Sequence, residues 1–91
     1  MQNDLEKMAL KNLMQIPGVG KSIARDLINI GIFAVSDLKN KNPETLYKKS
    51  NEFAGADQDP CLLYVFRCAV YYASNTKHDS EKLKWWNWKL S

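Results

Sequence analysis

Residues 13–28, LMQIPGVGKSIARDLI, contain the turn that organises the rest of the chain. Apolar residues at helical spacing lie on both sides of Pro17, Gly18 and Gly20, and proline and glycine mark the ends of helices. The pattern predicts two helices joined by a tight turn, a helical hairpin over residues 5–30. Glycines also leave main-chain amides uncovered, so the turn and the start of the second helix are suited to bind an anion.

Two cations follow the glycines, because Lys21 and Arg25 lie one helical turn apart. In that place they would flank a phosphate held by the amides of the turn. Such a contact touches no base edge, so the predicted binding is independent of nucleotide sequence. The predicted phosphate-binding residues are Gly18, Val19, Gly20, Lys21, Ser22 and Arg25, with Lys48 and Lys49 as possible auxiliary cations.

The same turn has other interpretations. A Gly-x-Gly turn with a purely structural role stays open, because such turns are common. A nucleotide-binding phosphate loop is suggested by Gly20, Lys21 and Ser22, but it needs a glycine where Gln15 stands and a strand before it. The residues before the turn predict a helix, which disfavours that second interpretation.

Helical spacing continues along the chain, and no alternating strand pattern persists. We expect a connector and third helix over residues 31–50, a loop over 51–59 and a long helix over 60–75. Asn42 and Pro43 are a typical N-cap and first residue of the third helix. The long helix is apolar around nearly its whole circumference, which is typical of a central, buried helix. In the first helix, the residues expected on the inner face are Leu5, Met8, Ala9, Leu13 and Met14.

The length and the composition, with 45% hydrophobic and 25% charged residues, are those of one small globular domain spanning residues 1–91. The helical spacing predicts that this domain is all-α, with four or five helices. Thirteen basic and ten acidic residues give a net charge of +3, which allows a nucleic-acid partner without requiring one. No apolar run is long enough to cross a bilayer and no signal peptide is visible. We therefore expect a cytoplasmic protein with no membrane partner.

The thiols and the histidine predict no metal, cofactor or catalytic site. Cys61 and Cys68 lie seven positions apart in one helix, which places their α-carbons roughly 10 Å apart. That separation excludes a disulfide and a shared zinc ion. A reactive Cys61 thiol of lowered pKa at the helix start stays open, but no general base accompanies it, so we expect a protein that is not an enzyme.

The aromatic tail over residues 77–91 has two interpretations, which concern Tyr64, Arg67, Tyr71, Trp85, Trp86 and Trp88. The first three of these residues form one stripe on the long helix, and with the tryptophans they would make a surface for a protein partner or for self-association. Alternatively, the tail folds back, so that a tryptophan stacks on Arg67 and covers the stripe. The second interpretation is the one we favour.

Several of these segments together resemble known proteins. The run 16–20 (IPGVG), with Ala24 four residues later, resembles the helix-hairpin-helix motif of DNA-binding proteins. Residues 31–47 are similar to the connector of SAM-like helical domains. The segments 59–73 and 84–88 resemble the small bacterial "pathogenicity locus" family. The resemblance implies a SAM-like domain with one helix-hairpin-helix and a presumed DNA-binding function.

One departure from the motif affects the expected strength of binding. Proteins of this kind that hold duplex DNA firmly usually present two hairpins, and the second would fall on residues 50–59 (SNEFAGADQD). That segment has no Pro-Gly turn and three acidic residues. The resemblance therefore implies weak, sequence-independent contact with the DNA backbone. The alternative is a protein-interaction or dimerisation module of the same SAM-like fold that does not bind nucleic acid.

Overall fold

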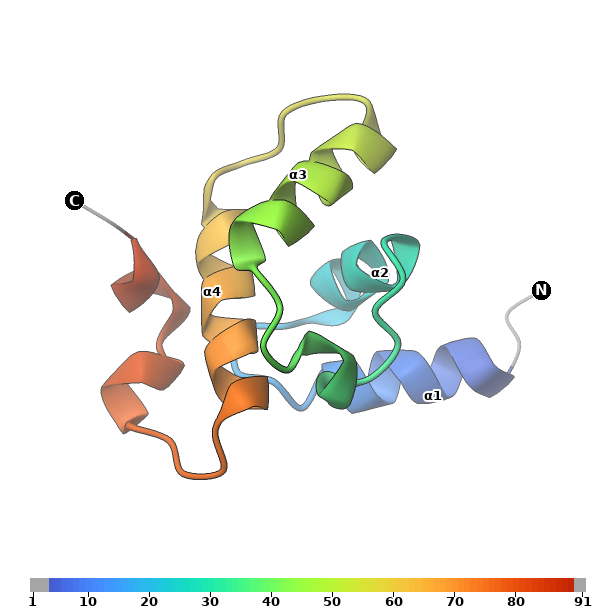
Figure 1. The fold of residues 1–91 in the computed structure, drawn as a ribbon. Helices are drawn as coiled ribbons and strands as arrows, with labels where there is room; N and C mark the ends of the chain where they lie inside the picture. The colour runs from blue at the N-terminus through green and yellow to red at the C-terminus, as the bar shows by residue number, and fades with distance from the viewer. Residues whose placement is uncertain (1–3, 90–91) are drawn as a thin grey trace.

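The computed structural model describes residues 4–89, and every regular element in this part of the chain is helical (Figure 1). The predicted all-α class is therefore confirmed. Residues 1–3 and 90–91, the two ends of the predicted domain, lie outside the described residues. The elements are α1 (Asp4–Leu13), α2 (Lys21–Asn29), η1 (Val35–Leu38), α3 (Pro43–Ala54), α4 (Cys61–Ser74), η2 (Ser80–Leu83) and η3 (Trp85–Trp88), where η denotes a 3-10 helix.

Helix α4 runs through the middle of the molecule. Figure 1 shows α1, α2 and α3 on one side of α4 and the tail with η2 and η3 on the other. Val65, Phe66 and Ala69 of α4 are buried. The core that they share with the other helices comprises Leu10, Leu13, Ile16, Val19, Ala24, Leu27, Ile32, Leu38, Leu46 and Leu62.

The turn between α1 and α2 is anchored to this core by three apolar residues. Leu13, Ile16 and Val19 recur every third position and are all buried. The Val19 N–H donates a hydrogen bond of 3.0 Å to the Ile16 carbonyl, which closes the turn. Gly18 lies between them with a φ of +86°, a conformation that a β-carbon disfavours. The buried residues thus hold the turn in place while Gly18 and Gly20 stay exposed.

The predicted inner face of α1 is partly wrong. Ala9 and Leu13 are buried as expected, together with Leu10, but Leu5 and Met8 are 76% and 65% exposed, and Met14 is exposed as well. Figure 1 shows the N-terminal end of α1 extending beyond the neighbouring elements, and Leu5 and Met8 are left uncovered.

Helix α3 begins as predicted and ends later than predicted. The Asn42 side chain accepts a hydrogen bond of 3.0 Å from the Thr45 N–H, which confirms it as the N-cap. The helix continues to Ala54, four residues into the segment 51–59 expected to be a loop, so that boundary was wrong. Gly55, with a φ of +72°, supplies the left-handed C-cap.

The tail folds back along α4. The Arg67 guanidinium donates a hydrogen bond of 2.9 Å to the Trp88 carbonyl, and the rings of Tyr71 and Trp88 lie 5.5 Å apart. The Trp88 indole N–H donates to the Lys82 carbonyl at 2.7 Å. The favoured interpretation, that the tail folds back, is therefore confirmed. The expected stacking of a tryptophan on Arg67 is wrong, because Arg67 lies over the ring of Tyr64, a residue of the same helix, at 5.6 Å.

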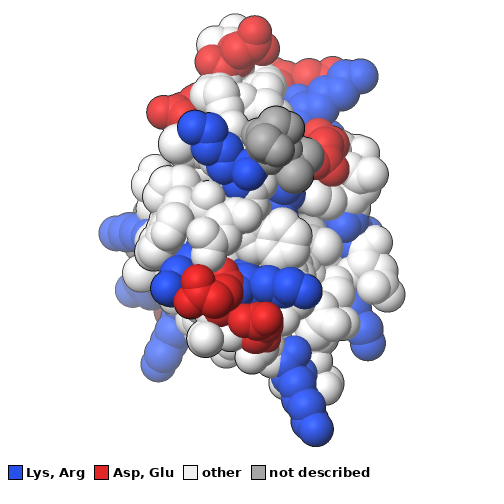
Figure 2. All heavy atoms as spheres, turned by 90° about the vertical axis from the view of Figure 1, so that its left-hand side faces the viewer, with Lys and Arg blue, Asp and Glu red and all other residues white. Residues whose placement is uncertain are grey.

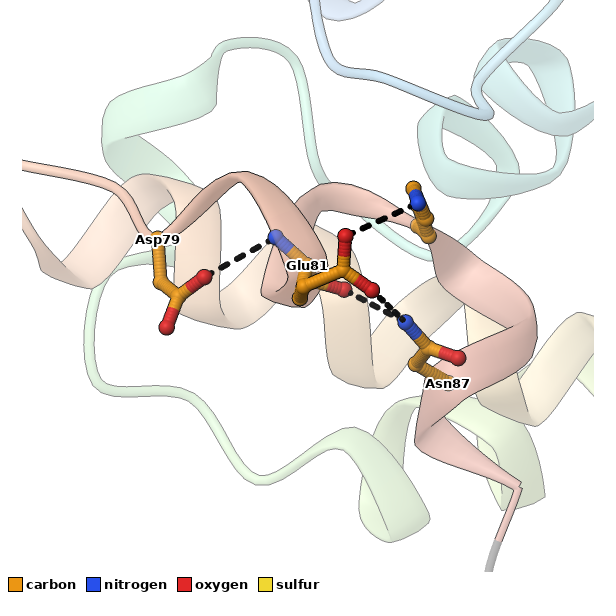
Figure 3. A network of polar contacts seen from close by, with 4 residues as sticks. Asp79, Glu81 and Asn87 are labelled. Atoms are coloured by element: carbon orange, nitrogen blue, oxygen red, sulfur yellow. Dashed lines mark hydrogen bonds and ion pairs between the residues drawn. The ribbon is translucent and has the colours of Figure 1, made fainter.

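Polar contacts within the tail join its two short helices (Figure 3). Asp79 caps η2 by accepting from the Glu81 N–H at 2.9 Å. The Asn87 side chain, from η3, donates to the Glu81 carbonyl at 2.8 Å, and Lys84 pairs with the Glu81 carboxylate at 2.9 Å. These contacts fix η3, and with it the tryptophans, in one position relative to η2.

Candidate nucleic-acid interface

The start of α2 is an exposed helix terminus without a side-chain cap. Gly20 is the N-cap and has no side chain to accept from the first-turn amides. The first intrahelical bond in this turn is that of the Ala24 N–H to the Gly20 carbonyl, at 2.9 Å. The amides of Lys21 and Ser22 therefore have no acceptor within the helix, and both residues are exposed. These N–H groups and the positive end of the helix dipole favour an anion at this position.

The two glycines of the turn have different roles. A β-carbon on Gly18 would lie 2.8 Å from Cδ1 of Trp85, closer than van der Waals contact allows. Gly20 has a φ of −92° and open space where a β-carbon would project. Gly18 is therefore needed for the turn and for the close approach of the tail, whereas Gly20 leaves the start of α2 uncovered.

Two of the predicted phosphate-binding residues are engaged within the protein. Val19 is buried and its N–H is bonded to Ile16, so that amide is not a free donor. Arg25 is half-buried and forms an ion pair with Glu6 of α1. Gly18 is exposed but has Trp85 packed against it, so the open part of the site consists of Gly20, Lys21 and Ser22. The auxiliary cations Lys48 and Lys49 are exposed on α3, a different element from the turn.

Two carboxylates lie near the turn and weaken its positive character. Asp26 of α2 lines a cavity of about 390 Å³ together with Gly18, Asp59 and Trp85. Burial raises the pKa of Asp26 above its ordinary value. The Cys61 N–H donates to Asp59 at 2.8 Å and lowers the pKa of that carboxyl, which keeps Asp59 charged. The two carboxylates that line this cavity beside Gly18 therefore oppose the binding of an anion at the turn.

The thiols differ from the reactive cysteine that the sequence left open. Both are free, and the hydrogen bond with Asp59 raises the pKa of Cys61. A lowered pKa was wrong because the adjacent carboxylate outweighs the helix terminus. Burial raises the pKa of Cys68 to about 11. Within residues 4–89, His, Cys, Asp and Glu do not gather in any group of three suited to a metal ion, and no helix there is long and apolar enough to span a bilayer.

Part of the exposed apolar surface lies in a groove beside α1. Leu5, Met8, Ile28 and Phe33 line an open groove of about 740 Å³ between α1, α2 and the segment before η1, which we call the α1 groove. Phe33 is 55% exposed. Sequence reasoning missed the groove because it assigned Leu5 and Met8 to the core. Helical spacing carried no signal for the groove, because Leu5 and Met8 share one helix face with the buried Ala9 and Leu13.

The fold and the exposed helix start define a small all-α protein with a helical hairpin and a docked aromatic tail. The chain matches the family described as "Pathogenicity locus" (Cdd1) over residues 6–91, and it belongs to this family, as the resemblance implied. It is also similar to a protein named mitomycin resistance protein McrB from Streptomyces lavendulae. The two are 31% identical over 77 residues, which span 85% of this chain and 70% of the relative. No solved structure matches the chain.

Proposed function

We propose that this protein binds the phosphate backbone of DNA without regard to sequence, with the α1–α2 hairpin acting as a helix-hairpin-helix in a SAM-like domain. The observation that carries the proposal is the exposed, uncapped start of α2, where the free amides lie beside Lys21. We propose binding alone and no catalytic reaction. A cytoplasmic location is part of the proposal and is supported by the two free thiols.

The charges of the site favour weak binding. Lys21 lies next to the free amides and supplies the charge there, since the charge of Arg25 is balanced by its ion pair with Glu6. With Lys48 and Lys49 as auxiliary cations, the protein would neutralise about three phosphates, which gives a slope of about −3 for log K against log salt. Binding of this kind has a dissociation constant in the micromolar range or weaker at physiological salt.

The proposal is tested by fluorescence anisotropy with a labelled random-sequence duplex, at about 50 and about 200 mM salt. Lys21→Glu should weaken binding at least about tenfold and reduce the salt slope by about one. Lys7→Glu is the matched control, since Lys7 is exposed on the half of α1 that extends away from the turn. Absence of binding by the wild type at the lower salt concentration, or equal losses in the two variants, would contradict the proposal.

A second candidate function, dimerisation, is favoured by the α1 groove. Its occupant would be a second copy of this chain, with the two α1 helices antiparallel across a twofold axis. The charges of α1 suit this arrangement, because Asp4 lies in the first turn and Lys11 in the last, so that the two oppose each other between copies. Sedimentation of the wild type and of Met8→Glu tests it. A concentration-dependent dimer that the variant abolishes is expected, and a wild type that stays monomeric would contradict it.

A further inference from the structure

The tail forms a hollow next to the α1–α2 turn. This hollow, which we call the tail hollow, measures about 390 Å³ and is lined by Asp59, Pro60, Cys61, Tyr64, Trp85, Trp86 and Lys89. Trp85 lines the tail hollow and also approaches Gly18 across the neighbouring cavity. Trp85 therefore packs against the turn and also lines the tail hollow.

The walls of the tail hollow suit a planar ring. The indoles of Trp85 and Trp86 stand 5.8 Å apart at 86°, so one ring presents its edge to the face of the other. Trp86 is 57% exposed, which is unusual for so large an apolar side chain. A flat molecule stacked on one indole meets the other at nearly a right angle, and Tyr64 adds a third aromatic surface.

The charged groups of the tail hollow exclude simpler ligands. Asp59 supplies an acceptor and Lys89 a donor, and their charges cancel. A free anion would find no net positive charge there, and a purely apolar molecule would desolvate both groups without replacing their hydrogen bonds. A nucleobase has a flat face for the indoles and an edge with both donors and acceptors. Figure 2 shows the face of the molecule that carries the tail, where charges of both signs are interspersed with uncharged surface.

We propose that the tail hollow binds an unpaired nucleobase of the strand whose phosphate lies at the start of α2. The inference rests on the proposed function, because the tail hollow has no net charge of its own with which to hold the backbone. A paired base enters such a hollow only after it leaves the stack, which costs free energy. The protein therefore prefers unpaired nucleotides to an intact duplex.

The experiment compares anisotropy titrations with a short mixed-sequence single strand, an abasic strand of the same length and the corresponding duplex. The wild type should bind the single strand about 5- to 150-fold more tightly than the abasic strand, the factor expected for stacking of one base. Trp86→Ala should bind the single strand no more tightly than the abasic strand, and its affinity for the abasic strand should equal that of the wild type. Trp86→Phe, which keeps a ring, should recover part of it. Phe53→Ala is the matched control, because Phe53 is 64% exposed on α3 and does not line the tail hollow.

Distinct outcomes separate this inference from the proposed function. Equal binding of single strand and duplex, with no effect of Trp86→Ala, overturns the inference, while a loss of abasic-strand binding in Lys21→Glu still supports the proposed function. No binding of any strand overturns both. An RNA strand of the same sequence tests whether the sugar contributes to binding. If Trp86→Ala weakens the binding of RNA and of DNA by the same factor, the ligand of the tail hollow is the base. A free nucleoside monophosphate that binds as tightly as the strand contradicts the inference, because the tail hollow would then be a small-molecule site.

Discussion

Gly18→Ala is expected to destabilise the protein strongly, because the new β-carbon meets two separate penalties. The φ of +86° costs a residue with a β-carbon about 1–2 kcal/mol. The contact of 2.8 Å with Trp85 displaces a packed ring, which typically costs about 1–3 kcal/mol more. The sum is about 2–5 kcal/mol, and at about 4–8 °C per kcal/mol for a domain of this size the melting temperature falls by at least roughly 8 °C.

The assay is urea denaturation followed by far-UV circular dichroism. Gly20→Ala is the matched control, because its φ is negative and its β-carbon would project into open space. We expect it to change the free energy of unfolding by less than about 1 kcal/mol, since the weaker N-cap and the stiffer unfolded chain offset each other.

A double-mutant cycle with Trp85→Ala isolates the steric part of the effect. Removal of the indole should relieve the clash and leave the φ strain, which gives a coupling energy of about 1 kcal/mol or more between Gly18 and Trp85. Equal losses for the two glycine variants, or a coupling energy near zero, would refute the close approach of the tail to the turn.

Three further variants probe single contacts. Asn42→Ala removes the N-cap of α3 and should lower stability by about 1 kcal/mol in the same urea assay. Asp59→Asn should bring the pKa of Cys61 down towards its ordinary value of 9.0, so the pH profile of its alkylation moves to lower pH, and an unmoved profile would count against the thiol–carboxylate contact. Asp26→Asn should raise the melting temperature at pH 7 and not at a pH well below 3.8. Because burial raises the pKa of Asp26, the folded state holds the proton more tightly than the unfolded state, and the wild type loses stability as the pH rises from 3.8 through the raised pKa. A gain that is the same at both pH values would contradict the burial of Asp26.

Local signals made the helical order predictable. Asn42 followed by Pro43 marks a helix start that involves only neighbouring residues, and the structure has the Asn42 cap in place. The end of α3 was missed although its C-cap, Gly55, is a local end signal, and a contact across the loop adds to it. Asn51 accepts from the Gln58 N–H at 2.9 Å, which ties the loop to the last turns of the helix. Helical spacing does not reveal that contact.

The candidate site was predictable only in part, for the same reason. The glycines and Lys21 are adjacent in sequence, so their common location at the start of α2 follows from local rules. The pairing of Arg25 with Glu6 and the approach of Trp85 to Gly18 join residues that are distant in sequence. Such contacts depend on how the helices pack, and a single sequence carries no direct signal for them.

The most direct test of the account follows backbone amide resonances while a short DNA strand is titrated into the labelled protein. If a phosphate binds at the start of α2, the amides of Gly20, Lys21 and Ser22 shift first and furthest, and added salt reverses the shifts. Shifts confined to the α1 groove, or none at all at low salt, would contradict phosphate binding at the start of α2.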